Sequence, residues 1–410
     1  MLTNKAIVLG ITGGIAAYKT ADLASKLVQA GAKVEVVMTE SATKFITPLT
    51  LRNITHRPIV TDMFEPASEY SLEHIALAEA ADVVVIAPAT ANTIAKLACG
   101  IADNELTCLV LATKAPVIVA PAMNDNMYHN PITRENLAKL KARGFAIVDP
   151  EYGRLASGKV GWGRLADIET IIATIKQVLG RSGDLAGKKI VVTAGGTQEP
   201  IDPVRHIGNR SSGKMGYAVA EAARDRGATV TLVTAPTSLS DPAGIEIVHI
   251  QTAREMKSAV AKAVAKADAL IMAAAVADYQ PKTTAKSKIK KDSLTLILEL
   301  VRTPDILMEV KGNFIRVGFA AESDDIIANA KQKLKKKNLD LIVANDITAT
   351  DSGFGVDTNK VTLIDRSGKI DKLPLLSKRE VAERILDRVR ELLVKKEGSK
   401  KQGDTTIIKK

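Results

Sequence analysis

The sequence contains little cysteine, few aromatic residues and no long apolar run. Its two cysteines, Cys99 and Cys108, offer neither a disulfide framework nor a cysteine-rich metal site, and they indicate a reducing compartment. No apolar stretch reaches the roughly 18 to 20 residues that a transmembrane helix needs. The apolar run from Ala6 to Ala17 is interrupted by Thr12-Gly13-Gly14, which argues against a secretory signal. We therefore expect a soluble, cytoplasmic protein with no membrane segment.

Aromatic residues make up 3% of the sequence, and alanine, valine, isoleucine and leucine form most of its apolar part. Strands that are buried on both faces of a parallel sheet have continuous runs of such residues. Four runs fit this description: Val83–Ala87, Val117–Ala120, Ala269–Ala273 and Leu341–Ala344. The composition thus predicts an α/β fold with mainly parallel sheets covered by helices.

The same local pattern begins twice, at Lys5–Gly14 and at Lys189–Gly196. Each time an apolar, β-branched run ends in paired glycines, and an alanine-rich helical stretch and a second apolar run follow. This is the order of a βαβ unit. A chain of 410 residues is also too long for one ordinary core. We predict two Rossmann-like domains whose different polar residues carry out two successive reactions.

A turn-rich connector separates the two domains. A predicted helix over Ile168–Leu179 is followed by Arg181–Gly187, which has the glycines and polar residues of a linker. We place the first domain at residues 1–185 and the second at 186–394. The remaining residues, 395–410, are polar and basic, and we expect a disordered tail there.

The formal net charge of +11 is typical of some nucleic-acid-binding proteins, so its distribution has to be considered. Besides the tail, the excess lies in Lys286–Lys291 and Lys331–Lys337, inside the second domain, where a nucleoside triphosphate is an alternative partner. No RNP-like aromatic motif or recognition-helix pattern accompanies these lysines. We expect no nucleic-acid partner, and a basic nucleic-acid-binding protein is the non-enzymatic alternative.

The glycine turn after the first strand is a candidate phosphate site. Gly10, Gly13 and Gly14 lack the spacing of the dinucleotide fingerprint. Thr39 ends the second strand where an NAD-binding protein would have an acidic residue, but Glu40 follows directly and leaves that comparison open. Backbone N–H groups at a helix start attract phosphate whichever nucleotide carries it. The turn therefore favours a phosphate site over tight packing alone.

More specific polar segments follow. His74 precedes one buried strand, Pro88-Ala89-Thr90 and Asn92 come after it, and Met123 and Asn124 come after the next. With these residues the first domain resembles the flavin-dependent cysteine decarboxylases, and in particular the phosphopantothenoylcysteine decarboxylases, which bind FMN in a Rossmann-like fold. The resemblance implies an FMN site formed by Thr12, Gly13, Gly14, Thr39, Pro88, Ala89, Thr90 and Asn92.

The same resemblance implies roles for the remaining residues. His74 would be the catalytic base, Asn124 would hold the substrate carboxylate, and Met123 would be a further substrate contact. Loss of CO2 needs an electron sink, which the flavin supplies by oxidising the cysteine thiol to a thioaldehyde. A histidine suits the base because it takes up a proton near neutral pH at low cost. Without this context, a histidine in an apolar helix is more often structural.

A glycine-rich segment, Gly153–Arg164, resembles the flexible clamp that covers the substrate in this family. Many relatives have a cysteine where this chain has Ser157, and that thiol is thought to donate a proton. A thiol with a pKa of about 8.5 donates a proton far more readily than an alcohol. Here either another group or water takes that role, or the reductive half of the reaction is slow.

The second domain begins with a sequence that partly matches a nucleotide-binding P-loop. Gly208–Lys214 has the spacing of that motif. However, Met215 stands where the Mg²⁺-binding hydroxyl belongs, and the preceding residues form a polar loop rather than a strand. We therefore do not predict a P-loop ATPase.

Nearly the whole second domain instead resembles the phosphopantothenate-cysteine ligases. The matching segments include Ile201–Arg205, Asn209–Gly216, Ala273–Tyr279, Thr303–Ile306 and Lys337–Asp346. The resemblance implies CTP bound by Ala273, Ala274, Ala275, Asp278, Lys288, Pro304, Asp305, Ile306, Leu307, Phe319, Lys333 and Lys337. It also implies that Asn209 manages an acyl-cytidylate intermediate and that Arg205 contacts the substrate phosphate.

Elementary chemistry agrees with these roles. A carboxylate condenses with an amine only after activation, and an anhydride with a nucleotide phosphate provides a good leaving group. Lys288, Lys333 and Lys337 can offset the triphosphate charge, with Mg²⁺ bridging phosphate oxygens and no dedicated protein site for the metal. Taken alone, the last two lysines fit a solvated helix face, and Asp278 fits a helix N-cap equally well.

Together the two resemblances predict a bifunctional enzyme of coenzyme A biosynthesis. The second domain would join phosphopantothenate to cysteine with CTP, releasing CMP and pyrophosphate, and the first would decarboxylate the product to phosphopantetheine. Members of the flavoprotein family form FMN sites between subunits, which implies a homo-oligomer. The alternatives for the first domain are decarboxylation of a peptide's C-terminal cysteine and prenyl transfer to flavin, and the ligase-like second domain argues against both.

Overall fold

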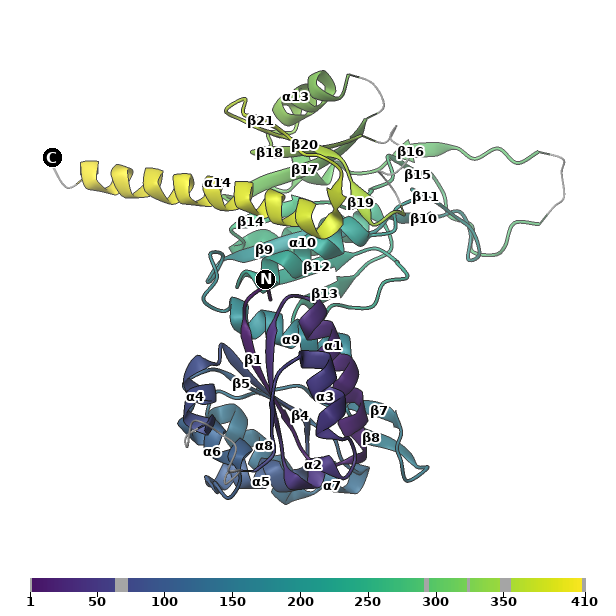
Figure 1. Ribbon diagram of the computed structural model, residues 1–410. Coiled ribbons are helices and arrows are strands. Elements are labelled where there is room, and N and C mark those ends of the chain that lie inside the picture. The colour runs from purple at the N-terminus through teal and green to yellow at the C-terminus, as the bar shows by residue number, and fades with distance from the viewer. Residues whose placement is uncertain (1, 63–72, 291–294, 323–324, 347–354, 408–410) are drawn as a thin grey trace. The chain divides into compact units, whose positions relative to one another are not determined.

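The computed structural model describes residues 2–62, 73–290, 295–322, 325–346 and 355–407 (Figure 1). The chain forms two compact units, Met1–Gly180 and Arg181–Lys410, called unit 1 and unit 2 below. Across the described ranges, no helix has both the length and the apolar character needed to cross a membrane.

Unit 1 is a parallel sheet with helices on both faces. Over its described residues the sheet has six strands in the order β3-β2-β1-β4-β5-β6. They are β1 (Ala6–Ile11), β2 (Lys33–Met38), β3 (Ile59–Val60), β4 (Val83–Ala89), β5 (Val117–Pro121) and β6 (Ala146–Ile147). Aliphatic residues fill these strands because both faces are covered, and every residue of β4 is buried.

The helices of unit 1 lie in two layers. One layer holds α1 (Thr20–Gln29), α3 (Pro48–Thr55) and α9 (Ile168–Gly180), and the other holds α4 (Glu73–Ala80), α5 (Ala91–Cys99), α6 (Glu105–Ala112) and α8 (Pro131–Ala142). Alternate residues of β1 pack on opposite faces of the sheet: Ile7 and Leu9 face the first helix layer, and Val8 faces the second. Three short helices, η1 (Ile15–Lys19), α2 (Glu40–Thr43) and α7 (Asp125–His129), follow strand exits.

A two-stranded antiparallel hairpin follows the sheet of unit 1. Its strands are β7 (Glu151–Arg154) and β8 (Val160–Arg164), so it contains the segment that the sequence indicates as a clamp. This hairpin and the strand exits build the cavity described below.

Unit 2 has a larger sheet with the same central plan. Over its described residues the sheet has eight strands in the order β13-β12-β9-β14-β17-β18-β20-β21, parallel except at β18-β20 and β20-β21. They are β9 (Lys189–Ala194), β12 (Thr229–Thr234), β13 (Glu246–His249), β14 (Ala269–Met272), β17 (Ile315–Glu322), β18 (Leu341–Asp346), β20 (Val361–Asp365) and β21 (Ile370–Lys372). The predicted α/β class with mainly parallel sheets is confirmed.

The remaining elements of unit 2 are helices and small strand pairs. The helices are α10 (Lys214–Asp225), α11 (Ala253–Ala263), η2 (Val264–Lys266), α12 (Ile306–Glu309), α13 (Ile326–Lys336) and α14 (Lys378–Ile407). The strand pairs are β10 (Gln198–Pro200) with β11 (His206–Gly208), β15 (Tyr279–Pro281) with β16 (Leu300–Arg302), and β19 (Thr358–Asn359) with β22 (Leu376–Ser377).

The connector between the units belongs to unit 2 in the structure. The division falls between Gly180 and Arg181, and Leu185 is fully buried in the core of unit 2. The sequence alone places the boundary a few residues later because its turn signals do not reveal where a single leucine packs.

The sequence predicts a disordered tail from residue 395. The structure instead continues helix α14 through this segment to Ile407. It packs on α10 and the sheet through Val381, Ile385, Leu386 and Val389, all buried. Once packing has nucleated a helix, each further residue adds one hydrogen bond at low cost, so the polar continuation stays helical. Nothing is described for the side chains beyond residue 397.

Candidate active sites

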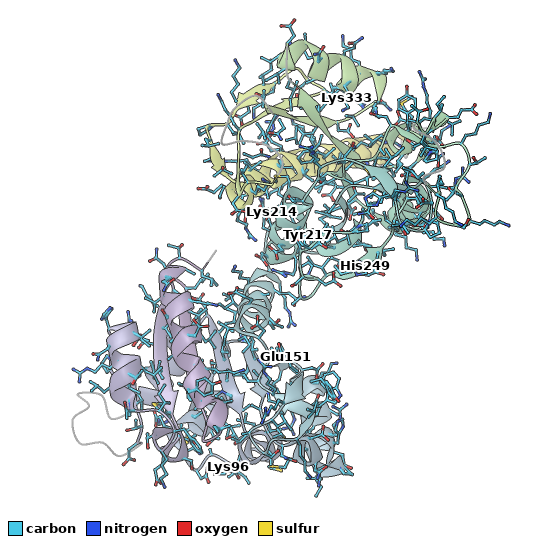
Figure 2. All side chains as sticks on the ribbon, turned by 90° about the vertical axis from the view of Figure 1, so that its right-hand side faces the viewer. Lys96, Glu151, Lys214, Tyr217, His249 and Lys333 are labelled. Carbon is cyan, nitrogen blue, oxygen red and sulfur yellow. The ribbon has the colours of Figure 1, made fainter. Side chains whose placement is uncertain are left out.

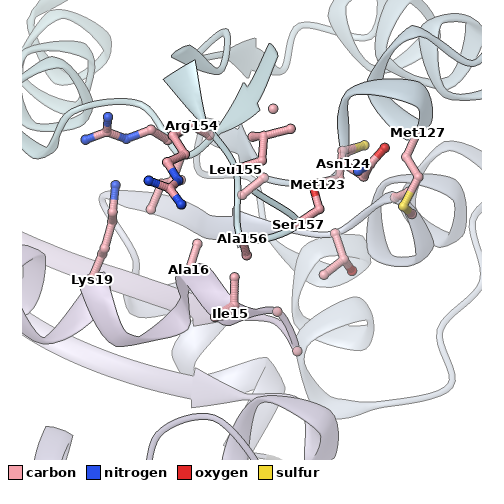
Figure 3. A pocket seen from close by; sticks show the side chains of 18 of the residues that line it. Ile15, Ala16, Lys19, Met123, Asn124, Met127, Arg154, Leu155, Ala156 and Ser157 are labelled. Atoms are coloured by element: carbon pink, nitrogen blue, oxygen red, sulfur yellow. The ribbon is translucent and has the colours of Figure 1, made fainter. Parts of the chain in front are cut away.

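A cavity of about 740 Å³ opens at the carboxyl edge of the sheet in unit 1 (Figure 3). Three strand exits line it: Gly13–Ala16 after β1, Thr90-Ala91 after β4 and Ala122–Asn124 after β5. The β7–β8 hairpin contributes Arg154–Gly158 and Gly163–Leu165. Parallel strands bring their carboxyl ends to one edge, which is the usual ligand position in an open α/β sheet.

The strand exits are tied together by Thr12. Its side chain is fully buried, and its hydroxyl donates to the Pro88 carbonyl (2.7 Å) and accepts from the Thr90 amide (3.0 Å). Thr90 in turn caps α5 by accepting from the Thr93 amide (3.3 Å). Thr12 therefore holds the edge of the cavity from within the fold.

The other residues that the resemblance assigns to FMN lie around the same edge. Gly13 and Gly14 line the cavity, and a Cβ on Gly13 would come within 2.3 Å of the Ser41 Cβ. Pro88 and Ala89 are buried in β4, and Asn92 is exposed in the first turn of α5. Gly13 is therefore required for close packing against α2, because a side chain at this position would displace Ser41.

Thr39 has a buried hydroxyl that can bond to a ligand at this edge. It follows β2, and its hydroxyl oxygen is buried with no hydrogen-bond partner among the residues that the structure describes. Buried hydroxyls in proteins almost always have a partner. A bound group with polar atoms, such as the ribityl phosphate of a flavin, would satisfy Thr39 at this edge.

The hairpin is fastened to the exit of β5. The Met123 amide donates to the Gly163 carbonyl (2.9 Å), and the Asp125 carboxylate accepts from the Trp162 amide (2.7 Å). This approach requires glycine, because a Cβ on Gly161 would lie 2.8 Å from Asp125 and one on Gly163 would lie 2.1 Å from the Met123 oxygen. The glycine pattern of the clamp is therefore explained by close backbone contact.

The active-site candidates Asn124 and Ser157 both line this cavity. Asn124 caps α7, and its Oδ1 accepts from the Asn126 amide (3.0 Å), which leaves its Nδ2 group to donate to a ligand. Ser157 is exposed in the turn of the hairpin, next to Gly158 at φ 82°.

One side of the cavity is cationic. Figure 3 shows Lys19 and Arg154 on one side and Asn124 and Met127 on the other, and Arg164 also lines the cavity. Burial lowers the pKa of the Lys19 ammonium, and Arg164 lowers it further, against the opposite effects of Glu151 and Asp167. Like charges held close together in this way favour an anionic ligand.

His74 lies elsewhere in unit 1. It is in the first turn of α4, where its Nδ1 is 3.5 Å from the Oε2 of the buried Glu105. It is not among the described residues that line the cavity, and Figure 1 shows α4 and the β7–β8 hairpin on opposite sides of unit 1. One copy of the chain therefore does not bring His74 together with Asn124 and Ser157.

The second candidate site lies at the carboxyl edge of the sheet in unit 2. β9 and β14 are neighbours there, and the buried hydroxyls of Thr193 and Thr197 accept from the amides of Ala274 (3.1 Å) and Ala277 (2.9 Å). These bonds position Ala273, Ala274 and Ala275, and Asp278 is exposed just beyond them. The Asn209 side chain donates to the Val276 carbonyl (3.2 Å), so it lies at the same edge.

Asp202 joins two segments of this site. Its fully buried carboxylate accepts from the Arg205 guanidinium (3.0 and 2.5 Å) and from the amides of Val204, Arg205 and Ile289 (2.9, 2.8 and 3.2 Å). The Arg205 guanidinium holds the pKa of Asp202 well below its usual range, against the effect of burial, and the amides add to the lowering. Arg205 and the segment with Lys288 are thus held together; Lys291, in the same basic cluster, lies outside the described residues.

A separate group surrounds the last turn of α13. Figure 2 shows Lys333 on this helix, where its ammonium donates to the Phe319 carbonyl (3.1 Å). Lys337 pairs with Asp305 (3.3 Å), which also caps α12. The Thr303 amide donates to the Asp278 carbonyl (3.0 Å), which places Pro304 and Asp305 beside the exit of β14. Most residues that the resemblance assigns to CTP are therefore brought together.

Two residues of this set are turned inward. Ile306 and Leu307 are 3% and 8% exposed in the core of unit 2, so a contact with nucleotide would have to come from their backbone. In the described part of the chain, no cluster of three or more His, Cys, Asp or Glu side chains could hold a metal ion.

Sequence reasoning missed three carboxylates that organise these sites. Asp125 fastens the hairpin, Asp202 holds Arg205, and Glu105 contacts His74. Asp125 and Glu105 look like ordinary acidic residues at helix starts, and Asp202 like one residue of a polar turn. The sequence offers no signal for their long-range partners.

Comparison with known proteins gives one family match for each of the two units. Residues 1–180 match the family model described as Flavoprotein, and residues 185–393 match that of the DNA/pantothenate metabolism flavoprotein C-terminal domain. The coenzyme A biosynthesis bifunctional protein CoaBC of Bacillus subtilis (strain 168) is 47% identical over 395 residues, which are 95% of this chain and 97% of that protein. The chain belongs to the CoaBC family.

Other proteins are also similar to this chain. The CoaBC protein of Escherichia coli (strain K12) is 44% identical over 396 residues, covering 95% of this chain and 97% of that protein. A crystal structure of a CoaBC C-terminal domain is 41% identical, with a TM-score of 0.46, and covers 52% of this chain and all of that one. The FMN-dependent cysteine decarboxylase SpaF is 33% identical, with a TM-score of 0.38. The match covers 42% of this chain and 96% of that one.

Membership of this family confirms the predicted bifunctional enzyme of coenzyme A biosynthesis. The flavoprotein half is a decarboxylase, and the pantothenate-metabolism half is a ligase. Each half has its own candidate site at the carboxyl edge of its own sheet.

The fastening of the hairpin can be tested with Gly163→Ala. The added methyl group would collide with the Met123 oxygen and move the hairpin, and a displacement of about 1 Å at an active site can cost about 100-fold in rate. We expect decarboxylation to fall at least ~10-fold while ligation in the same chain is unchanged.

The matched control is Gly158→Ala in the same hairpin. Gly158 also has a positive φ, but a Cβ at this position would have nothing within 4 Å, so this variant carries backbone strain without the collision. Equal losses in both variants would show that the Gly163 contact has no special role.

Proposed function

We propose that unit 2 joins phosphopantothenate to cysteine with CTP through an acyl-cytidylate, and that unit 1 decarboxylates the resulting phosphopantothenoylcysteine with FMN to give phosphopantetheine. The observation that carries this proposal is the pair of carboxyl-edge sites: Asn124 and a cationic side line the first, and Asn209 and Asp278 lie at the second. Because CTP and thiol substrates are found in the reducing cytoplasm, we place the enzyme there.

FMN is proposed for the edge formed by Gly13, Gly14, Thr39 and Thr90. Both glycines line the cavity, and the buried hydroxyl of Thr39 is a donor for a phosphate or ribityl oxygen. Bound there, FMN would supply the thiol oxidation that makes loss of CO2 possible. The chain's own residues bind the substrate and move its protons.

The two sides of the cavity suit the two ends of the substrate. The Nδ2 group of Asn124 can donate to the cysteine carboxylate, and Met123 and Met127 offer apolar contact. Lys19, Arg154 and Arg164 on the cationic side can bind the phosphate of phosphopantothenoylcysteine. Ser157 lies in the same cavity, where its hydroxyl can hold a water or a substrate oxygen although it is a weak acid.

A second copy of the chain is proposed to complete this site. His74, the proposed base, lies on the α4 side of unit 1, away from the cavity that holds Asn124. Ile75 beside it and Met127 at the cavity are both partly exposed apolar residues, at 37% and 47%. A homo-oligomer would bury such residues and bring His74 of one copy to the cavity of another.

Mixing two inactive variants tests this assembly. We expect His74→Gln and Asn124→Ala each to lose at least ~100-fold in decarboxylation, because each removes a group in direct contact with substrate. Co-expression of the two should restore part of the activity, since some sites then receive an intact His74 and an intact Asn124 from different copies.

The matched control co-expresses His74→Gln with His74→Ala, which can restore nothing. If mixed oligomers of the first pair form but stay inactive, His74 acts within its own chain or has no role in the reaction, and the proposed assembly is wrong.

In the ligase site, three groups have complementary tasks. Arg205, oriented by Asp202, can bind the substrate phosphate, and Asn209 lies at the exit of β14, where the acyl-cytidylate would form. Lys333 and Lys337 can offset the charge of CTP, with Mg²⁺ bridging its phosphate oxygens. In this scheme the phosphate oxygens of CTP hold Mg²⁺, so the protein needs no carboxylate cluster of its own for the metal.

Nucleotide binding can be tested with Lys337→Gln. Removing one positive charge beside the proposed triphosphate should raise the KM for CTP roughly 10-fold, equal to about 1.4 kcal/mol, with little change in the KM for cysteine. Ligation is followed as CMP and phosphopantothenoylcysteine, with ATP in parallel reactions to establish the nucleotide preference.

Lys336→Gln is the control, because Lys336 is the neighbouring lysine on α13 and is exposed. An equal rise in both variants would indicate a general charge effect, and no rise in either would remove Lys337 from the nucleotide site.

A further inference from the structure

Glu105 is a buried carboxylate beside the proposed base of the decarboxylase. Its side chain is 4% exposed, and it lies in the first turn of α6 next to Leu106 and Leu109 of the apolar core. A carboxylate is costly to bury unless it has a hydrogen-bonding or charged partner. The position therefore calls for an explanation beyond helix stability.

Helix stability alone would not require burial. An acidic residue at a helix start is favoured by the helix dipole, but an exposed carboxylate obtains this benefit without desolvation. The start of α6 is moreover already fixed by a reciprocal capping box, in which the Thr107 amide donates to Asn104 (3.1 Å) and the Asn104 amide to Thr107 (3.3 Å). The cap holds the backbone of Glu105 in place, so the Glu105 side chain is not needed for capping and can serve another group.

That group is His74. Its Nδ1 is 3.5 Å from Glu105 Oε2, and its side chain is 24% exposed, so one ring edge faces the carboxylate while part of the ring reaches solvent. Burial raises the pKa of the nearby Cys108 thiol, and the charges of Glu105 and Asp103 raise it further.

We propose that Glu105 is a positioning residue for His74. The carboxylate accepts from Nδ1–H, which fixes the tautomer, leaves the lone pair on Nε2 and aims that nitrogen outward. When Nε2 takes a proton from the substrate, the imidazolium is stabilised by the carboxylate a few ångströms away. This inference rests on the proposed role of His74 as base of the decarboxylation.

The kinetic test uses the full-length enzyme loaded with FMN and phosphopantothenoylcysteine as substrate. We expect Glu105→Leu to lower kcat for decarboxylation at least ~10-fold with little change in KM, because general-base catalysis contributes about 100- to 10,000-fold and the base would be misaligned. Glu105→Gln should lose less, since its amide oxygen can still accept from Nδ1–H.

The matched control is Asp103→Asn. Asp103 is an acidic residue two positions away that is half exposed and pairs with Lys96 (2.6 Å), so its loss should leave kcat unchanged. Ligation by unit 2 and FMN retention serve as checks that each variant is folded. If Glu105→Leu and Glu105→Gln both keep kcat within about 2-fold of the parent, the inference is overturned.

A spectroscopic test detects the tautomer directly. The chain has five histidines, so solid-state NMR of ¹⁵N-histidine-labelled enzyme, with His74→Gln for assignment, can resolve the ring nitrogens of His74. We expect the proton on Nδ1 in the parent and in Glu105→Gln, and a shift toward Nε2 in Glu105→Leu. The same tautomer in all three proteins would contradict the inference.

Two failures can be told apart. An inactive His74→Gln with fully active Glu105 variants removes only the positioning role. A fully active His74→Gln removes His74 as the base, and the proposed function of that residue falls together with the role of Glu105.

Discussion

In each unit a buried threonine fastens the exit of the first strand to the exit of the strand beside it. Thr12 bonds to Pro88 and Thr90 at the ends of β1 and β4, and Thr193 and Thr197 bond to Ala274 and Ala277 after β9 and β14. Parallel strands leave unpaired backbone groups at their carboxyl ends. These hydroxyls satisfy part of that need and fix the neighbouring strand exits relative to one another, and the other polar groups of each site are added to these exits.

On this common frame the two units add different polar groups. Unit 1 adds a hairpin, held by Asp125 and by glycines that allow backbone contact, and thereby closes a cavity with one cationic side. Unit 2 adds a buried aspartate that orients Arg205, and a helix whose lysines face Asp305 and Phe319. The same sheet edge therefore supports a flavin-dependent decarboxylase in one unit and a ligase in the other.

Much of this was predictable from the sequence because it depends on local patterns. The apolar runs mark β4, β5, β14 and β18, and the Gly153–Arg164 segment marks the hairpin. Contacts between distant residues were not predictable: nothing local shows that Asp202 will accept from the Ile289 amide, or that Glu105 will face His74. The helical continuation of α14 was missed because its composition is that of a disordered segment, and packing further up the helix decides its state.

The most direct measurement is mass spectrometry of the products formed from phosphopantothenate, cysteine, Mg²⁺ and CTP by the purified, FMN-loaded enzyme. We expect phosphopantetheine and CO2 together with CMP and pyrophosphate, which requires both carboxyl-edge sites to work and shows that Ser157 supports turnover. Accumulation of phosphopantothenoylcysteine without phosphopantetheine would contradict the decarboxylase site as described, and unchanged substrates would contradict both sites.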